Sequence, residues 1–299
     1  MSTKFDLTFC IADKYIHVLF PEGVDGREWL PTYHPFYVRE ATEPLMADIH
    51  VVPDEVSAEI EGERLGLFDN GNGNHVVCRL PEGGYKILIT NVQGELSAAM
   101  RTTADFSRVD VSLYGSEAAQ HFGLNNCVMV AYAFSGAYFG ILLMHSSVIM
   151  NDGRGYLFLG TSGTGKSTHS DLWVRHIPGS EILNDDNPAV RWRDGVAYVY
   201  GTPWSGKRDF YRQIGLPIGA FVRLQQAKEN AIRRCPAVEA YAVIRSSTST
   251  MIWDKPSFTH ICDTASAIAA ATPVFHLRNL PVEAAARMSY EASQAALAE

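Results

Sequence analysis

The spacing of hydrophobic and polar residues divides the chain into a strand-rich first part and a second part in which strands and helices alternate. Up to about residue 114, short apolar stretches with strand composition are separated by turn-forming sequences such as PEG and DNGNGN. The predicted strands are FDLTFCI, YIHVLF, FYVRE, ADIHVV, HVVCRL, YKILIT and VDVSLY, which begin at residues 5, 15, 36, 47, 75, 85 and 109. The pattern predicts a β-rich N-terminal domain over residues 1–114.

The second part, residues 115–299, has the alternation typical of an α/β domain. A helical pattern over 119–143 leads into the strand LMHSSVIM, the tight turn NDGRG and the strand YLFLG. A further helix runs to about His176, and the strand EILN is expected to return beside YLFLG. The remaining predicted strands are VAYVYG, IGAFVRLQ and PVFHL, and the remaining helices are VEAYAVIRSS and VEAAARMSYEASQAALA.

One stretch, CVMVAYAFSGAYFGILLM at residues 127–144, raises the question of a membrane span. It carries no charge, and its 18 residues reach the length at which a span is considered. It also contains Ser135, two glycines and two tyrosines, and it follows two asparagines rather than basic residues. We therefore expect a buried core helix that runs into a strand, with a membrane span as the alternative.

Composition and charge exclude several classes of protein. The 299 residues suit one large domain or two ordinary ones, and 46% of them are hydrophobic, enough for a core. The net charge of −8, without a basic run, argues against a nucleic-acid partner. The first twenty residues are a poor signal peptide, and the five cysteines form no CxxC pair. These features predict a cytoplasmic protein with reduced thiols.

The stretch GTSGTGKST is the strongest candidate for chemistry. It fits G-x-x-x-x-G-K-[ST] at every fixed position, with a predicted strand before it and a helix after it. In such a loop, glycines let backbone N–H groups converge on phosphate oxygens, the lysine reaches the β- and γ-phosphates, and the following hydroxyl ligates Mg²⁺. The alternative is a glycine-rich turn before a helix. The predicted nucleotide-binding residues are Gly160, Thr161, Ser162, Gly163, Thr164, Gly165, Lys166, Ser167 and Thr168.

Three further positions are candidates because of where the predicted strands end. Asp185 and Asp186 follow EILN, at the strand ends where α/β domains gather their functional groups. Paired aspartates there can hold Mg²⁺ and accept a proton, although NDDNP is also good turn chemistry. His145 is by pattern a core residue. Its strand is nevertheless joined by a tight turn to the strand that enters the loop, which predicts that it lies near Lys166 and Asp185.

The turn GTPWSGKR brings two more cations into consideration. Lys207 and Arg208 could contact a transferring phosphoryl group, but the residues alone are equally consistent with a solvated basic turn.

The segment MHSSVIMNDGRGYLFLGTSGTGKSTHS, followed by ILNDDNPAV, resembles the nucleotide-binding core shared by HPr kinase/phosphorylases and phosphoenolpyruvate carboxykinases. The resemblance rests on a histidine, the loop and a paired aspartate in this order, and it covers roughly residues 144–224. Residues 1–114 resemble neither family. The resemblance implies a P-loop domain of the carboxykinase/HPr kinase type that uses ATP (or GTP) and Mg²⁺.

The resemblance also implies roles for individual residues. The carboxykinase histidine that matches His145 is a metal ligand, here for a second, softer metal such as Mn²⁺. The HPr kinase pattern implies that Asp186 is the base, Asp185 the metal ligand, and Lys207 or Arg208 a cation near the phosphates. Thr168 stands where HPr kinases usually carry glutamate, so the reverse phosphorylase reaction and the exact substrate are not carried over.

These observations lead to three functional hypotheses. The first is an HPr-kinase-like ATP-dependent kinase that phosphorylates a hydroxyl on a protein or peptide serine or on a small molecule. Catalysis would rest on Asp186, Lys166 and His145. The second is a nucleotide-binding regulatory or accessory module without phosphoryl transfer to a substrate. The third, a small carboxykinase, is the least favoured. The expected partners are a nucleotide and a hydroxyl-bearing acceptor, with neither nucleic acid nor membrane involved and with homo-oligomerisation left open.

Overall fold

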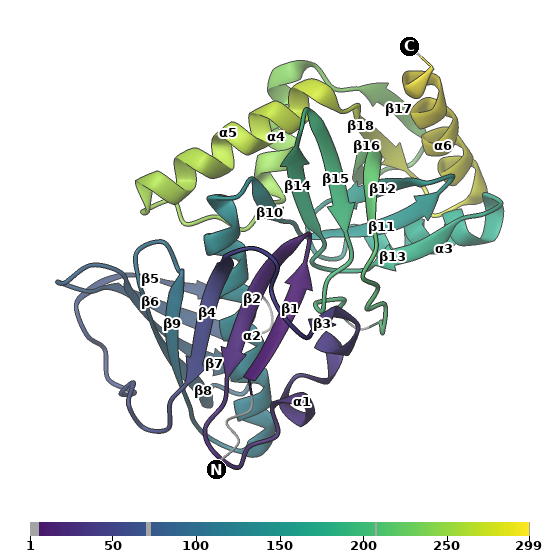
Figure 1. The fold of residues 1–299 in the computed structure, drawn as a ribbon. Helices are drawn as coiled ribbons and strands as arrows, with labels where there is room; N and C mark the ends of the chain where they lie inside the picture. Colours follow the sequence, from purple (N-terminus) through teal and green to yellow (C-terminus); the bar gives the residue numbers. More distant parts are fainter. Residues whose placement is uncertain (1–5, 70–72, 207, 299) are drawn as a thin grey trace. The chain divides into compact units, whose positions relative to one another are not determined.

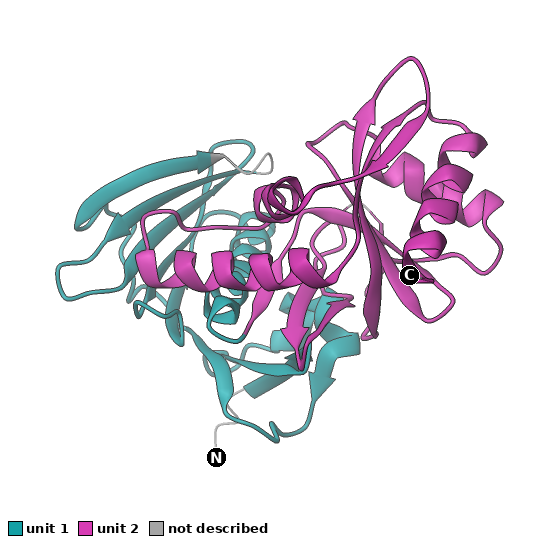
Figure 2. Cartoon of the chain, turned by 90° about the horizontal axis from the view of Figure 1, so that it is seen from above, with its two compact units in different colours: residues 1–139 teal, residues 140–299 magenta. Residues whose placement is uncertain are grey.

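The boundary between the two compact parts of the chain lies further along the sequence than expected. The computed structural model describes residues 6–69, 73–206 and 208–298 and separates into units of Met1–Phe139 and Gly140–Glu299 (Figures 1 and 2). The predicted boundary at 114/115 is therefore wrong. Helix α2, Glu117–Ala137, packs on strands β4, β7, β8 and β9 of the first unit, and this burial assigns it to that unit.

The first unit is a mixed sheet with α2 against one face (Figure 1). Within its described residues, nine strands follow the order β3-β1-β2-β4-β9-β8-β7-β6-β5. Their bounds are β1 Asp6–Ile11, β2 Lys14–Leu19, β3 Tyr37–Val38, β4 Leu45–Val51, β5 Glu63–Asp69, β6 Gly73–Arg79, β7 Tyr85–Asn91, β8 Leu96–Thr102 and β9 Arg108–Leu113. A short helix α1, Gly26–Trp29, and a 3-10 helix, Pro31–Phe36, follow β2.

Every strand predicted in the first unit has a counterpart, but β5 and β8 were not predicted. In β8 the reason is packing. Ala98 and Ala99 are fully buried, and a Cβ on Gly123 of α2 would lie 2.5 Å from the backbone oxygen of Ser97. Small residues let the helix approach the strand closely, so β8 lacks the β-branched composition that identifies strands in a sequence.

The stretch that raised the question of a membrane span is divided between two elements. Cys127 to Ala137 belongs to α2, and the chain then turns into strand β10, Ile141–Leu143. The predicted core helix running into a strand is confirmed. Among the described residues, no helix is both long enough and apolar enough to cross a membrane.

The second unit is also mixed α/β, with nine strands among its described residues. The order is β10-β14-β15-β16-β12-β11-β13, and β18 pairs with β16 and β17. The strands after β10 are β11 Ser146–Asn151, β12 Arg154–Leu159, β13 Glu181–Asn184, β14 Ala189–Arg193, β15 Val196–Tyr200, β16 Gly215–Gln226, β17 Ala231–Arg234 and β18 Val274–Asn279. The helices are α3 Lys166–His176, α4 Ala237–Ser246, α5 Lys255–Ala271 and α6 Glu283–Leu297.

Strands β14 and β17 and helix α5 were not predicted, and two further details of the sheet differ from the predictions. LMHSSVIM is not one strand, because β10 ends at Leu143 and pairs with β14, whereas β11 starts at Ser146 and pairs with β12 and β13. EILN, which is β13, lies beside β11 rather than beside β12. The hairpin strand β11 occupies the position next to β12, and β16 pairs with the other edge of β12.

Helices α3 and α6 enclose the core on one face of this sheet. Trp173 of α3 is fully buried among aromatic rings, with centroids 5.0 Å from Tyr156 and 5.4 Å from Phe158. Its indole Nε1–H donates to Ser289 Oγ of α6 at 2.9 Å. This packing holds α3, whose first residue is Lys166, against the strand that enters the glycine-rich loop.

His169 lies in the same core, one turn into α3, and its contacts determine its tautomer. The hydroxyl of Ser289 donates to the backbone oxygen of Ala286 at 2.9 Å, so its oxygen accepts from His169 Nε2–H, at 3.0 Å. Nδ1 of His169 is buried without a hydrogen-bond partner. Burial lowers the pKa of this imidazole from 6.5 to about 4, since a charge there would be poorly solvated.

We expect His169 to make the folded state sensitive to mild acid. Its folded pKa lies below its unfolded value, so its contribution is complete above pH 6.5 and is lost as pH falls towards 4. Between pH 7 and 5 this loss amounts to about 2 kcal/mol. Urea unfolding at pH 7 and pH 5 measures this loss in the wild type and in His169→Gln. The glutamine keeps a donor for Ser289 but does not titrate. Equal losses in the two proteins would contradict the assignment.

Candidate functional site

Three chain segments meet where strands β11, β12 and β13 end on the same side of the second sheet. They meet because β11 runs antiparallel to both of its neighbours. Ser146, the first residue of β11, is paired with Leu159, the last residue of β12, and Val148 is paired with Asn184, the last residue of β13. The residues just outside these ends are His145, the glycine-rich loop and the aspartate pair. The strand directions therefore bring together the candidates that the sequence places up to 41 positions apart.

The glycine-rich loop adopts a conformation that requires glycine. Gly163 and Gly165 have φ angles of 79° and 102°, in the left-handed region. A Cβ at either position would meet nothing within 4 Å, so the requirement is conformational rather than steric. Thr164 Oγ1 donates to the backbone oxygen of Thr161 at 2.6 Å, and Gln226 Nε2 donates to that of Gly163 at 3.2 Å. These bonds hold the loop in a defined shape.

Helix α3 begins directly after the loop with an N-terminus that is open to an anion. Gly165 is its N-cap and provides no side-chain hydrogen bond, and the first turn holds no acidic residue. Backbone N–H groups in the first turn of a helix have no partner within the helix, and they carry its partial positive charge. An anion at this position would accept hydrogen bonds from these N–H groups.

Lys166, His145 and Asp186 form a chain of polar contacts beside the loop. Lys166 Nζ lies 2.9 Å from His145 Nε2, and His145 Nδ1 lies 3.0 Å from Asp186 Oδ1. An ammonium group only donates, so Nε2 accepts and the imidazole proton is on Nδ1, the nitrogen that lies near the carboxylate. His145 is thus a neutral bridge between a cation and an anion. The prediction that it lies near Lys166 is confirmed.

The Lys166 ammonium is partly withdrawn from water. Its Nζ also donates to the backbone oxygen of Gly160 at 2.9 Å. Burial lowers the pKa of Lys166, and the negative charges of Asp186 and Asp185 partly oppose that shift. A desolvated cation interacts more strongly with an incoming anion than a fully hydrated one does.

The turn that carries the two aspartates is fixed by the segment 201–205, whose role the sequence did not reveal. Asp185 N–H donates to Ser205 Oγ at 3.1 Å, and Asn184 Nδ2 donates to Thr202 Oγ1 at 3.2 Å. Asp186 N–H donates to Asn184 Oδ1 at 3.1 Å. Thr202 and Ser205 are both almost fully buried. The available signal was the set of hydroxyls in GTPWS, which must find partners when they are buried.

Arg208 is engaged with carboxylates rather than lying open beside the loop, which differs from its predicted role as a phosphate contact. Its Nη1 and Nη2 lie 2.8 and 2.9 Å from the two carboxylate oxygens of Asp171, and its Nε lies 3.1 Å from Asp185 Oδ2. The hydrogen bonds to Asp171 raise the pKa of Arg208. The other predicted cation, Lys207, lies outside the described residues.

The second carboxylate oxygen of Asp185 is a candidate ligand for a metal ion. The side chain of Asp185 is only 5% exposed, and its Oδ1 is buried with no hydrogen-bond partner. A buried carboxylate oxygen without a partner is costly unless a cation or donor completes it. Ser167, in the first turn of α3, offers a hydroxyl oxygen. Carboxylate and hydroxyl oxygens suit Mg²⁺, so this donor set fits the ion that the sequence predicted.

A cavity of about 700 Å³ opens beside these groups. It lies between residues 160–164 of the loop, residues 223–226 at the end of β16, and the C-terminal end of α4, and His145 also lines it. Its size falls within the range of small-molecule sites, about 300–1,000 Å³. The loop, the lysine–histidine–aspartate chain and the cavity together offer a place for an anionic ligand of nucleotide size.

Comparisons with known proteins add little to this geometry. No protein-family profile matches the chain, and no curated protein matches it. Among solved structures, it is similar to an Hpr(Ser) kinase/phosphatase from Coxiella burnetii, with 11% sequence identity and a TM-score of 0.33. That match covers 52% of this chain and 99% of the other. A likeness this weak carries no argument about the chemistry of the site.

We expect Arg208→Met to destabilise the second unit by leaving Asp185 buried and uncompensated. Breaking a buried ion pair costs about 3–5 kcal/mol, and the partial exposure of Arg208 reduces this to about 2 kcal/mol. The double variant that also carries Asp185→Asn no longer contains an unpaired buried negative charge. It should therefore recover part of the lost free energy of unfolding. Chemical denaturation of the single and double variants in the presence of a chelator measures both effects. If the loss of unfolding free energy in the double variant equals the sum of the losses in the two single variants, the pair is not coupled.

Proposed function

We propose that the second unit is a P-loop nucleotide-binding domain of the carboxykinase/HPr kinase type and that the chain is a kinase. It transfers the γ-phosphoryl group of ATP or GTP to a hydroxyl of a protein, a peptide or a small molecule. The observation that carries the proposal is the Lys166–His145–Asp186 chain beside a G-x-x-x-x-G-K-S loop. It joins a phosphate-binding cation to a carboxylate able to accept a proton.

The loop and the start of α3 supply the nucleotide-binding groups. The backbone N–H groups of residues 161–167 would hold phosphate oxygens, and Lys166 Nζ would exchange its contact with the backbone oxygen of Gly160 for one with the β- and γ-phosphates. Ser167 and Asp185 would hold Mg²⁺, which supplies charge neutralisation when bound. Hydrogen bonds already fix the shape of the loop, so little ordering is needed on binding.

Asp186 is the general base. In the transfer, the acceptor oxygen forms its bond to the γ-phosphorus, the bond from that phosphorus to the leaving diphosphate breaks, and the hydroxyl proton passes to Asp186. His145 Nδ1 lies 3.0 Å from Asp186 Oδ1, so the base already lies beside the imidazole before the acceptor binds. Positioning and charge neutralisation supply most of the rate in such reactions.

His145 Nε2 gives this residue a second possible role. Its lone pair, which accepts from Lys166 in this structure, is the feature a metal ligand needs. The Nδ1–H to Asp186 contact matches the carboxylate–histidine pairing that orients metal-binding imidazoles. A softer ion such as Mn²⁺ would suit that nitrogen. The kinase proposal needs His145 only as the group that positions Asp186.

A nucleotide-binding regulatory module that transfers nothing to a substrate is the second candidate function. The observation in its favour is the contact between Arg208 and Asp185, which neutralises the carboxylate proposed to hold the metal. In such a module, bound nucleotide would change the surface that the unit presents to a partner, and Asp186 would have no proton to accept. Turnover distinguishes the two functions.

Lys166→Ala should weaken the binding of Mg²⁺–ATP at least tenfold while leaving the fold intact. A hydrogen bond from a charged donor contributes about 1.5–3 kcal/mol, and about 1.4 kcal/mol corresponds to a tenfold change in Kd. Isothermal titration calorimetry measures the affinity. Lys255→Ala, at an exposed position at the start of α5, is the matched control. Unchanged affinity in Lys166→Ala would remove the loop from the site.

Asp186→Asn should strongly lower turnover but preserve nucleotide binding. Water serves as the acceptor, and release of ADP is measured together with the Kd of a non-hydrolysable ATP analogue. Loss of a general base lowers turnover by about 10²–10⁴-fold, whereas the analogue should bind within a few-fold of wild type. Asp185→Asn should instead raise the Mg²⁺ concentration required. Asp194→Asn, at a side chain that is 91% exposed, is the control.

Two outcomes would decide against parts of this proposal. Near-normal ADP release by Asp186→Asn would mean that another group accepts the proton. Tight ATP binding by the wild type without ADP release or transfer to any acceptor would favour the regulatory module.

A further inference from the structure

A row of titratable side chains crosses the face of the first sheet opposite to α2. Strand alternation places apolar residues such as Ile16 and Ile49 in the core and the intervening residues on the other face. Strand register aligns His17 with Asp48, Asp48 with Arg108, and His50 with Asp110. Members of the row are Asp6, His17, Asp48, His50, Arg108 and Asp110. It lies in a different unit from the candidate nucleotide site.

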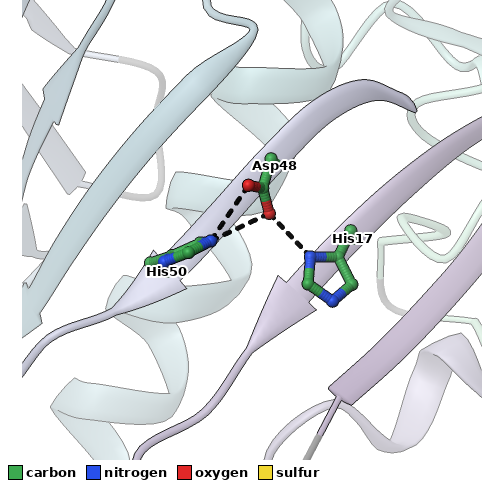
Figure 3. Close-up of side chains that lie close together, drawn as sticks. All are labelled: His17, Asp48 and His50. Atoms are coloured by element: carbon green, nitrogen blue, oxygen red, sulfur yellow. Dashed lines mark hydrogen bonds and ion pairs between the residues drawn. The ribbon is translucent and has the colours of Figure 1, made fainter. Parts of the chain in front are cut away.

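Three of these side chains converge on a single point (Figure 3). His17 Nδ1 lies 2.6 Å from Asp48 Oδ1, and His50 Nε2 lies 3.0 Å from each oxygen of Asp48. The potential ligand atoms of the three residues all lie within 4.8 Å of one another. The side chains of His17, Asp48 and His50 are only 15, 30 and 20% exposed, so they form a partly sheltered group.

We propose that His17, Asp48 and His50 bind a divalent first-row transition-metal ion such as Zn²⁺. Two imidazole nitrogens and one carboxylate oxygen form a donor set that such ions prefer over Mg²⁺ or Ca²⁺. Tetrahedral ligands at about 2.0–2.1 Å from an ion lie about 3.3 Å from one another. The two histidine nitrogens now lie 2.6 and 3.0 Å from the carboxylate of Asp48, so binding requires each of these contacts to lengthen by less than 1 Å.

Asp6 supports this assignment from the other side of His17. Its carboxylate contacts His17 Nε2, the nitrogen opposite to the one that faces Asp48. With Nδ1 binding an ion, Nε2 carries the proton and donates it to Asp6. This is the carboxylate–histidine–metal arrangement that fixes the tautomer and strengthens the ligand. The neighbouring strand β1 therefore supplies an outer-shell partner for His17.

Arg108 opposes the ion and sets its affinity. Its Nη2 donates to His50 Nδ1 at 2.8 Å, which leaves the proton of that imidazole on Nε2, the nitrogen that must bind the metal. Arg108 Nη1 also contacts Asp48 Oδ2 at 3.3 Å. Metal binding therefore requires the guanidinium to withdraw to Asp110, from which Nη2 is already only 3.1 Å away. The proton of His50 then moves to Nδ1.

Titration of the full-length chain with Zn²⁺ or Co²⁺ alone, without nucleotide, tests the site. Calorimetry gives the affinity, and the visible absorption of Co²⁺ reports coordination by a few protein ligands. His17→Ala and His50→Ala should each weaken binding at least tenfold. His34→Ala, an exposed histidine of the same unit, is the matched control. The same titrations in the His145→Ala background exclude any contribution from an ion bound at the nucleotide site.

Arg108→Gln tests the proposal in the opposite direction, because no loss of structure can produce a gain in affinity. It removes the competing donor and charge and should tighten Zn²⁺ binding about tenfold. Equal binding by the wild type, His17→Ala and His50→Ala would overturn the proposal. Binding confined to Arg108→Gln, or binding by neither that variant nor the wild type, would also overturn it. The group would then be an ion-pair network only.

Discussion

The candidate site depends on the position of one strand, β11, between β12 and β13. Because β11 runs antiparallel to both neighbours, its first residue lies at the same edge of the sheet as their last residues. The glycine-rich loop, His145 and the aspartate pair are continuations of these three ends. A parallel strand in that position would carry His145 to the opposite edge. The backbone hydrogen bonds of the hairpin thus maintain the Lys166–His145–Asp186 chain.

Charge is distributed around this edge in two linked groups. Lys166 faces Asp186 through the neutral His145, and Arg208 bridges Asp171 and Asp185. Each carboxylate of the pair therefore has a different cationic partner, which separates their environments although they are adjacent in sequence. Such separation is how neighbouring acids acquire different roles.

The sequence predicted local structure correctly where the residues allow only one conformation of low energy. A G-x-x-x-x-G-K-S loop between a strand and a helix needs left-handed glycines, and Gly163 and Gly165 adopt that conformation. A tight turn between two strands restricts them to a hairpin, which is why the position of His145 could be predicted. It was uninformative where packing replaces propensity. The buried alanines of β8 and the hydroxyls of 201–205 have no periodic signature, and their roles depend on partners distant in the chain.

By itself the sequence determined the composition of the candidate site: a glycine-rich loop, a lysine, a histidine and two aspartates in a fixed order. It also determined that the first part of the chain is strand-rich. Only the tertiary structure decided which groups touch. It assigned α2 to the first unit, paired Arg208 with Asp171 and Asp185, and aligned His17, Asp48 and His50 across neighbouring strands. Strand register and side-chain pairing are set by long-range burial and hydrogen bonding, which local sequence patterns do not encode.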